Sequence, residues 1–397
     1  MSPVKLAPGV YWIGALDPEL RTFDVIMKAE HGTTYNSYLV KGEKGCAVIE
    51  TVKAKFFDPY LGGISTLVEP SRIDYIVMNH TEPDHSGSLG NLLGEAPSAT
   101  VVSSRNAAAF IKGLLNRDPG IRTVGDGDSI DLGGLTLQFI QAPFLHWPDT
   151  MFTYIPERKI LFPCDFLGSH FADERMFDDL VDDFSHARRY YFDVIIRPFK
   201  EFANRALDSI QDLPIDMIAP SHGPILRTGV SRYLEAYRQW SEAPEKGEQP
   251  YVLVFYASSY GNTRRMAEKV AEGCREAGAE VAVYDLEATV PGSILDEVER
   301  ADALAVGSLT INGDAVKPVW DLLTSLATIK VRGKLACAFG SFGWSGEAVG
   351  FMEDRLKALK FKIPVEGIKV QLVPTGKDLA QCRELGEKLV GSLPGRG

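Results

Sequence analysis

Met78-Asn79-His80-Thr81-Glu82-Pro83-Asp84-His85-Ser86-Gly87 is the stretch from which the fold of the first half of this chain can be argued. It reads H-x-E-x-D-H and places four side chains that can bind a metal within six residues: His80, Glu82, Asp84 and His85. The apolar run Ile73–Met78 directly before it is typical of a buried strand. We therefore expect these side chains on a loop at the carboxyl end of a strand, where rigid folds commonly present reactive groups.

Three later fragments each place one more candidate ligand directly after an apolar run. They are Leu145-His146-Trp147-Pro148-Asp149, Pro163-Cys164-Asp165-Phe166 and Ala219-Pro220-Ser221-His222-Gly223. If the apolar runs are strands, His146, Asp165 and His222 can converge with the first cluster on one end of a sandwich. The joint pattern therefore predicts a metal site.

The other histidines match no ligand position: His31, His170 and His186. A single histidine is usually a hydrogen-bonded core or surface residue, and that interpretation is kept for these three. His170 is expected to lie nearest the site, because it follows Asp165 on the same stretch.

Length and charge bound the class of protein. The chain has 397 residues, which at ~100–200 residues per domain predicts two or three domains. A net charge of −11 without a basic stripe argues against nucleic acid or an anionic membrane as a partner. The N-terminus lacks a basic start followed by an apolar segment, and the chain has no run of ~18 apolar residues. We expect a cytoplasmic protein without a membrane span.

The cysteines are five in number, scattered, and without a C-x-x-C pair: Cys46, Cys164, Cys274, Cys337 and Cys382. This pattern predicts reduced thiols that serve mostly as small core residues. It argues against zinc or iron–sulfur ligation by cysteine, and against a rubredoxin-like module on this chain.

The texture of the sequence changes once, at the polar stretch 241–250, which carries two prolines and is the best candidate for a linker. The first ~245 residues are strand-rich with interspersed helices, which fits two packed sheets with helices outside. After residue 250, strands and helices alternate strictly, which predicts a doubly wound parallel sheet. The expected strands are 251–256, 280–285, 302–307, 334–339 and 366–373, and the expected helices are 262–278, 293–299, 315–328, 346–360 and 377–391.

The first strand-to-helix turn of the second half, Tyr256–Thr263, is rich in small hydroxyl residues and contains Gly261. Backbone N–H groups at such a turn, together with the positive end of the helix dipole, can hold a phosphate monoester. A hydroxyl-capped helix without a ligand would look similar. The position of the turn in a doubly wound domain favours phosphate binding.

The order H-x-E-x-D-H, His, Asp and Ser-His-Gly resembles the metallo-β-lactamase superfamily, whose hydrolases usually carry H-x-H-x-D-H. Glu82 stands where the second histidine would be, and this variant, like the fragment around His146, resembles the flavodiiron proteins. The Tyr256–Thr263 turn resembles the flavodoxin phosphate loop. The resemblance covers nearly the whole chain. It implies a metallo-β-lactamase-like αββα sandwich over residues 1–245 and a flavodoxin-like FMN-binding domain over 250–397, without further C-terminal modules.

The resemblance implies a set of iron ligands. His80, Glu82 and His146 would bind one iron, Asp84, His85 and His222 would face the other, and Asp165 would bridge. Mixed histidine and carboxylate ligands suit iron, whereas zinc is also common in histidine-rich sites. Ligation by His85 is left open, because two-metal sites often leave one position to water or substrate.

The resemblance also implies FMN-binding residues on three loops. They are Ser258, Ser259, Tyr260, Gly261, Asn262 and Thr263, then Leu309, Thr310, Ile311, Asn312 and Gly313, then Ser341, Phe342, Gly343, Trp344 and Gly346. Trp344 offers an aromatic face for the flavin, although a core or interface aromatic would fit too. Leu309 departs from the proline common in the second loop.

Asp24, in Thr22-Phe23-Asp24-Val25, departs from the family's Phe-His-Gly. This departure leaves the preference between dioxygen and nitric oxide open.

The implied reaction is reduction of dioxygen to water, or of nitric oxide to nitrous oxide, at a di-iron centre that FMN re-reduces. The implied electron donor is a rubredoxin-like protein or reduced deazaflavin, and the implied assembly is a head-to-tail homodimer or a dimer of dimers. Two other functions stay open. One is a metal-dependent hydrolase, and the other is an electron-transfer or gas-sensing flavoprotein whose metal site is structural.

Overall fold

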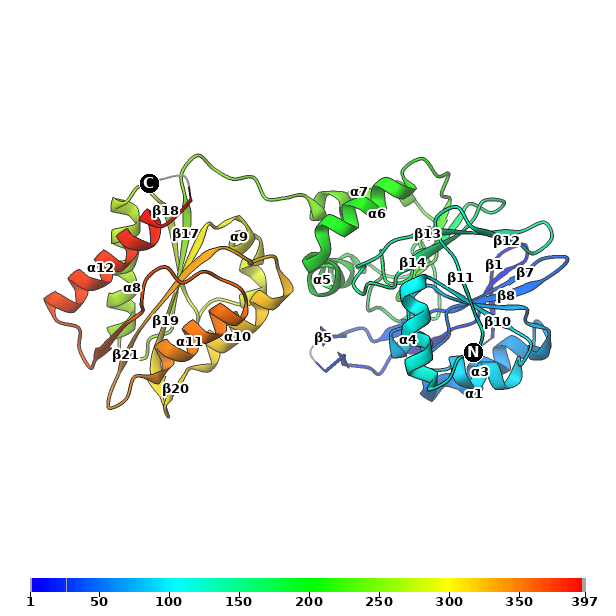
Figure 1. Cartoon of the computed structure of the whole chain (residues 1–397), viewed down its shortest axis with the longest axis horizontal. Coiled ribbons are helices and arrows are strands. Elements are labelled where there is room, and N and C mark those ends of the chain that lie inside the picture. Colours follow the sequence, from blue (N-terminus) through cyan, green and yellow to red (C-terminus); the bar gives the residue numbers. More distant parts are fainter. Residues whose placement is uncertain (1, 26, 395–397) are drawn as a thin grey trace. The chain divides into compact units, whose positions relative to one another are not determined.

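The computed structural model describes residues 2–25 and 27–394 (Figure 1). The chain divides into two compact units, Met1–Glu242 and Ala243–Gly397, and each is described by itself. In the described part of the chain, no helix is both long and apolar enough to cross a membrane.

The described part of unit 1 is built on two large sheets. The first has the order β1 (Val4–Ala7), β2 (Val10–Trp12), β7 (Tyr38–Lys41), β8 (Cys46–Ile49), β9 (Tyr75–Met78), β10 (Thr100–Ser103) and β11 (Ile121–Thr123). The second has the order β12 (Ser129–Asp131), β13 (Thr136–Gln141), β14 (Met151–Ile155), β15 (Ile160–Phe162) and β16 (Met217–Ile218). Two antiparallel two-stranded sheets complete the described strands of unit 1: β3 (Ala15–Asp17) with β6 (Thr33–Tyr35), and β4 (Thr22–Phe23) with β5 (Met27–Lys28).

Alternation along the strands of unit 1 creates two apolar layers. Val40, Ile49 and Val77 belong to a buried cluster that also contains Leu137 and Phe162 of the second sheet, so this cluster lies between the sheets. The alternate residues of the same strands belong to a second cluster with the helices. Figure 1 shows α1 (Phe57–Ser65), α3 (Leu89–Glu95) and α4 (Arg105–Leu115) beside the first sheet, and α5 (Ser185–Tyr191), α6 (Lys200–Ile210) and α7 (Val230–Ser241) beside the second. The predicted αββα sandwich is confirmed.

Unit 2 has the strand order β18 (Glu280–Asp285), β17 (Tyr251–Tyr256), β19 (Ala303–Ile311), β21 (Leu335–Phe342) and β22 (Ile368–Gln371), and all neighbours in this path are parallel. In chain order this is 2-1-3-4-5, the order of flavodoxin-like folds. Figure 1 shows α8 (Asn262–Glu276) and α12 (Gly376–Gly391) on one face of the sheet, and α9 (Leu295–Arg300), α10 (Lys317–Ser325) and α11 (Glu347–Ala358) on the other. The predicted doubly wound sheet is confirmed.

Two strands of unit 2 are longer than the sequence predicted. The residues Leu309, Thr310 and Ile311 were expected on a loop but extend β19, which pairs with β20 (Asp314–Ala315). Asn312 and Gly313 connect these strands with φ values of 53° and 76°, which is the hairpin geometry that Asn-Gly favours. Likewise β21 continues through Phe342. Strand pairing therefore includes residues that the resemblance to flavodoxin assigned to loops.

Helices α8 and α12 approach each other closely through two glycines. A Cβ atom added to Gly386 would lie 2.1 Å from the carbonyl oxygen of Val270, and one added to Gly273 would lie 1.9 Å from that of Arg383. Both obstacles are backbone atoms, so relief requires the helices to move apart. Glycine at these positions is therefore required by packing.

We expect Gly386→Ala to destabilise unit 2 by about 1–3 kcal/mol, because overpacking forces the two helices apart. The matched control is Gly350→Ala on α11, where no described atom lies within 4 Å of the added Cβ. That change should be neutral or stabilise by up to about 1 kcal/mol. Calorimetry of the full-length chain checks both. Equal transition temperatures in the two variants would contradict the packing account.

Candidate metal centre and flavin-binding loops

The seven predicted metal ligands follow the carboxyl ends of strands in unit 1. His80 and Glu82 lie directly after β9, His146 lies between β13 and β14, Asp165 follows β15, and His222 follows β16. The stretch predicted as a loop in fact turns into a short helix, α2 (Pro83–Ser86), which carries the remaining two ligands. Proline at the first helical position supplies the φ value that starts this helix.

One group of donor atoms gathers around the first carboxylate of the motif. His80, Glu82, His146 and Asp165 offer ligand atoms that all lie within 4.8 Å of one another. Glu82 Oε2 lies 3.3 Å from His80 Nε2 and 3.1 Å from His146 Nε2, and Asp165 Oδ2 lies 3.6 and 3.3 Å from the same two nitrogens. Ligands ~2.1 Å from one ion lie roughly 3–3.4 Å apart, so the spacing suits a single ion.

A second group shares Asp165 with the first. Asp84, His85 and His222 form a buried set with ligand atoms within 4.8 Å of one another. Asp84 Oδ1 lies 3.3 Å from His85 Nε2, and Asp84 Oδ2 lies 3.0 Å from His222 Nε2. Asp165 Oδ1 lies 3.1 and 3.4 Å from these two nitrogens. Asp165 therefore turns one oxygen toward each group, as a bridging carboxylate would.

Several buried polar atoms of these groups make no hydrogen bond within the described chain. They are both carboxylate oxygens of Asp84, both ring nitrogens of His85, and Asp165 Oδ2. Buried polar atoms are almost always satisfied, and each exception calls for a physical reason such as a bound ion. Metal cations between these atoms would satisfy them, so the residues present fit a two-metal centre.

The orientation of the imidazoles supports this fit. His80 Nδ1 lies 3.2 Å from Asp149 Oδ1, and His222 Nδ1 contacts the carbonyl oxygen of Thr34. With hydrogen on Nδ1, each ring donates away from the centre and turns the lone pair of Nε2 toward it. Metal-binding histidines commonly have such an acceptor, which fixes the tautomer and the orientation of the ring.

The buried carboxylates create a strongly negative field. Burial by itself lowers the pKa of His80, but hydrogen bonds to Asp149 and Glu82 raise it to about 10. Burial also lowers the pKa of His85, and the charge of Asp84 contributes to raising it to about 10. The same field that favours protons on these rings favours metal cations between them.

Sequence reasoning missed two carboxylates beside the ligands. Asp149 was quoted in the fragment around His146 but given no role, and it accepts hydrogen bonds from the backbone and hydroxyl of Thr81 at 2.8 and 2.6 Å. Glu50, 1% exposed, accepts from the backbone N–H groups of Asn79 and His80. Little in the sequence indicated a role for Glu50, because it is a single acidic residue directly after the apolar strand β8.

Glu50 also faces the second metal group. Its Oε2 lies 3.6 Å from His85 Nδ1, on the side of the ring that points away from Asp165. Cys164, directly before Asp165, lies next to the same pair and could form a ligand group with them. The thiol is buried, and burial raises its pKa well above the usual value. We therefore assign Glu50 a positioning role for His85 and the loop after β9.

A pocket of about 270 Å³ opens onto the metal groups. Glu82, Asp84, His146, Asp165 and His222 line one side, and Met27, Val194 and Phe199 are among the apolar residues that line the rest. Tyr191 also lines it and donates a hydrogen bond to Asp165 Oδ1 at 3.1 Å.

Asp24, which the sequence comparison marked as a departure from the family's Phe-His-Gly, lines the same pocket. Its pKa is raised to about 6, first by burial and then by Glu82 and Asp84.

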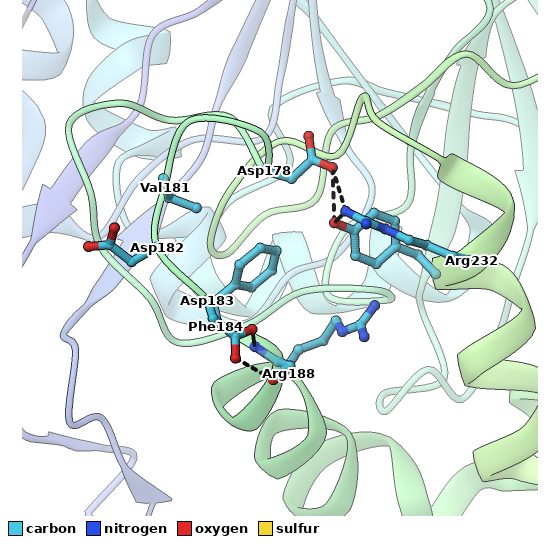
Figure 2. A pocket seen from close by; sticks show the side chains of 9 residues that line it. Asp178, Val181, Asp182, Asp183, Phe184, Arg188 and Arg232 are labelled. Carbon is cyan, nitrogen blue, oxygen red and sulfur yellow. Dashed lines mark hydrogen bonds and ion pairs between the residues drawn. The ribbon is translucent and has the colours of Figure 1, made fainter.

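A second pocket in unit 1, of about 250 Å³, has different chemistry (Figure 2). Asp178 in its wall accepts hydrogen bonds from the Tyr233 hydroxyl and from Arg232. Asp183 accepts from the backbone and hydroxyl of Ser185 at the start of α5. These carboxylates are committed to structural hydrogen bonds, so the pocket at the metal groups is the better candidate for chemistry.

The three predicted flavin-binding segments lie at the carboxyl ends of β17, β19 and β21, which are adjacent parallel strands, so the segments share one edge of the sheet. Leu309–Ile311 form the end of β19, and Ser341 and Phe342 form the end of β21. Gly261, with φ of 79°, starts α8 without a side-chain hydrogen bond that caps the helix. By contrast, Ser104 caps α4 and Thr375 caps α12. The first N–H groups of α8 therefore remain available to a phosphate, which fits the predicted loop.

Aromatic residues beside this turn are uncovered. Tyr260 is 91% exposed and Trp344 is 80% exposed, so the structure does not place Trp344 in the core of unit 2. Thr263 is buried and shares a hydrogen bond of 2.8 Å with Ser341, which ties the first loop to the third. Exposed aromatic faces on the first and third predicted loops would suit a flavin ring.

Comparison with known proteins agrees with both halves of the chain. Residues 33–223 match a family described as ODP family beta lactamase, and residues 254–386 match flavodoxin. Flavo-diiron protein FprA2 of Clostridium acetobutylicum is 40% identical over 99% of this chain and 100% of its own length. A nitric oxide reductase of Moorella thermoacetica is 37% identical over 98% of this chain and 99% of its own.

A solved structure gives the same answer. Rubredoxin oxygen:oxidoreductase from Desulfovibrio gigas has a TM-score of 0.76 and 29% identity, and the match covers 100% of this chain and 99% of that one. The match therefore spans both units of this chain. The chain belongs to the flavodiiron protein family and is an oxidoreductase.

Proposed function

We propose that this protein reduces dioxygen to water or nitric oxide to nitrous oxide at a di-iron centre that FMN re-reduces. The observation that carries the proposal is Asp165, whose two oxygens face two separate ligand groups on a chain that also has a flavodoxin-like unit. Residues 1–245 would form the di-iron domain and residues 250–397 the FMN domain. The names of the relatives, one a nitric oxide reductase and one an oxygen oxidoreductase, support this pair of substrates.

The residues would act as follows. His80, Glu82 and His146 would hold one iron, Asp84, His85 and His222 the other, and Asp165 both. The iron pair would bind the gas and, with the flavin, supply electrons.

The rest of the pocket would position the gas and exclude water. Met27, Val194 and Phe199 form an apolar wall that suits a small diatomic molecule. The Tyr191 hydroxyl points its proton at Asp165 Oδ1, and burial raises its pKa well above the usual value, so it stays neutral. Neutral Tyr191 therefore adds no further negative charge beside the carboxylates.

A hydrolase of the metallo-β-lactamase type is the other function to weigh. Glu82 Oε2 lies 3.1 Å from His146 Nε2, so a carboxylate occupies the place of a histidine in the first ligand group. That change suits iron better than zinc. Hydrolysis would also leave the flavodoxin-like unit without a role, and both observations favour the redox reaction.

The electron donor and the assembly belong to the same proposal. A rubredoxin-like protein is the donor we favour, because the name of the Desulfovibrio gigas protein includes rubredoxin. Reduced deazaflavin is the second candidate. A head-to-tail homodimer, or a dimer of dimers, would bring the flavin of one chain to the irons of another.

The reaction can be tested by mixing chemically reduced protein with dissolved dioxygen or nitric oxide under otherwise anaerobic conditions. We expect rapid loss of the gas together with re-oxidation of the flavin, and nitrous oxide as the product from nitric oxide. Hydrolysis of a lactam or phosphate ester by protein that consumes neither gas would refute the proposal.

Asp165→Asn should remove at least one iron per chain and lower gas turnover more than about 100-fold, because an amide cannot bridge two cations with two anionic oxygens. The control is Asp131→Asn at the exposed end of β12, where no loss is expected. Metal analysis and gas consumption of the two variants are the measurements. Two tightly bound irons in Asp165→Asn would argue against the bridge.

Glu50→Gln should keep the loop after β9 in place, because the amide oxygen can still accept the two backbone N–H groups. It should weaken iron binding at the position of His85 by about 10- to 100-fold, because the negative acceptor behind the ring is lost. Iron dissociation under chelator and the electron paramagnetic resonance spectrum of the partly reduced protein report this. An unaltered spectrum with unaltered iron retention would show that Glu50 does not position His85.

Trp344→Ala should weaken FMN binding by about 5- to 10-fold, since stacking of aromatic faces contributes on the order of 1 kcal/mol. Fluorescence titration of the flavin-free protein measures this. The matched control is Phe351→Ala, which removes an exposed aromatic side chain on α11. It should leave the dissociation constant for FMN unchanged. If the two changes altered the dissociation constant for FMN equally, Trp344 would not be part of the flavin site.

A further inference from the structure

We propose that a divalent transition-metal ion such as Zn²⁺ binds at a third metal site in unit 1, in a pocket lined by His31, His170 and His186. The chain has seven histidines, and four of them belong to the two metal groups described above. The other three all line this one pocket, which has a volume of about 180 Å³. The interpretation of these three as isolated structural residues is therefore replaced by a shared site.

His170 provides the observation that points to a ligand. The residue is 3% exposed, and its Nδ1 lies 3.0 Å from the hydroxyl of Thr33. Its Nε2 is buried and has no hydrogen-bond partner in the described part of the chain. Leaving such an atom unsatisfied costs about 1–3 kcal/mol. Because Nδ1 is engaged by Thr33, Nε2 is the ring atom left to receive a ligand.

The backbone holds His31 beside His170. The carbonyl oxygen of His31 accepts the N–H of Ala172 at 2.9 Å, and His31 forms a parallel bridge with Phe171. The His31 and Phe171 rings lie 5.2 Å apart between centroids. Two histidines from distant parts of the sequence are thus fixed on neighbouring segments.

Helix α5 brings the third histidine. His186 and Tyr190 are four residues apart on α5 and therefore lie on the same face of the helix. The Tyr190 hydroxyl accepts the backbone N–H of Lys28 at 3.2 Å, which ties α5 to the segment that leads to His31. His186 and Tyr190 line the pocket together with Glu30. Three chain segments therefore meet around one cavity.

The donor set selects the kind of ion. Imidazole nitrogens and one carboxylate suit borderline divalent ions, with zinc a common partner of such sets. In the described chain the nitrogens of the three rings do not gather within 4.8 Å of one another. His31 and His186 have exposed side chains, so rotation about their side-chain bonds can bring them to buried His170. The buried ring would supply the fixed ligand and the exposed rings would close on the ion.

The experiment is a Zn²⁺ titration of the full-length protein as purified, with its own metals and flavin, by equilibrium dialysis and metal analysis. We expect one additional zinc per chain, bound without release of the metals already present. His31→Gln and His186→Gln should each weaken this binding by at least about 10-fold while the original metal content stays constant. Arg117→Gln, at an exposed position outside the pocket, should bind zinc like the parent.

Three results would overturn the proposal. The first is no additional zinc at millimolar concentration. The second is zinc uptake matched by release of an equal amount of the original metal, which would place the zinc at the dimetal centre. The third is zinc binding that both histidine variants retain at full strength.

Discussion

The structure depends on how unit 1 buries several carboxylates in one place. Glu82, Asp84 and Asp165 converge at the strand ends of the sandwich. Asp149 lies directly behind His80, and Glu50 lies behind His85. Charged groups of one sign cannot be taken out of water together unless opposite charge accompanies them. The hydrogen-bond pattern leaves ligand atoms unsatisfied where cations would lie. The proposed metal ions would supply this opposite charge, so they would stabilise the fold as well as provide its chemistry.

The candidate metal site could be predicted from the sequence because each of the four fragments that carry its residues follows an apolar run. Parallel arrangement of β15 and β16 brings Asp165 and His222 to one edge, and β9 delivers the H-x-E-x-D-H motif to the same end. The roles of the two supporting carboxylates, Asp149 and Glu50, could not be predicted in the same way. Glu50 carries no motif, and its role depends on hydrogen bonds to Asn79 and His80, which are about thirty residues away in the sequence.

In unit 2 the alternation of strands and helices predicted the architecture, because apolar strands and amphipathic helices repeat without interruption. The boundaries near the flavin edge were less predictable. The resemblance to flavodoxin assigned Leu309 to Ile311 to a loop, whereas pairing with β21 and β20 makes them strand. The close contact of α8 with α12 was also hidden, since Gly273 and Gly386 look like weak points of a helix until the opposing backbone is seen.

Two chemistries are proposed for one chain. One is a carboxylate-rich centre that would hold cations, and the other is a parallel sheet whose edge, within the described residues, offers helix N–H groups without a side-chain cap and exposed aromatic faces. Metal and flavin content per chain, measured on anaerobically purified protein, tests this most directly. We expect about two irons and one FMN per chain. Two irons follow from the two candidate ligand groups, and one FMN follows from the single predicted phosphate-binding turn, Tyr256–Thr263. Two zinc ions and no flavin would contradict it and would turn attention to hydrolysis.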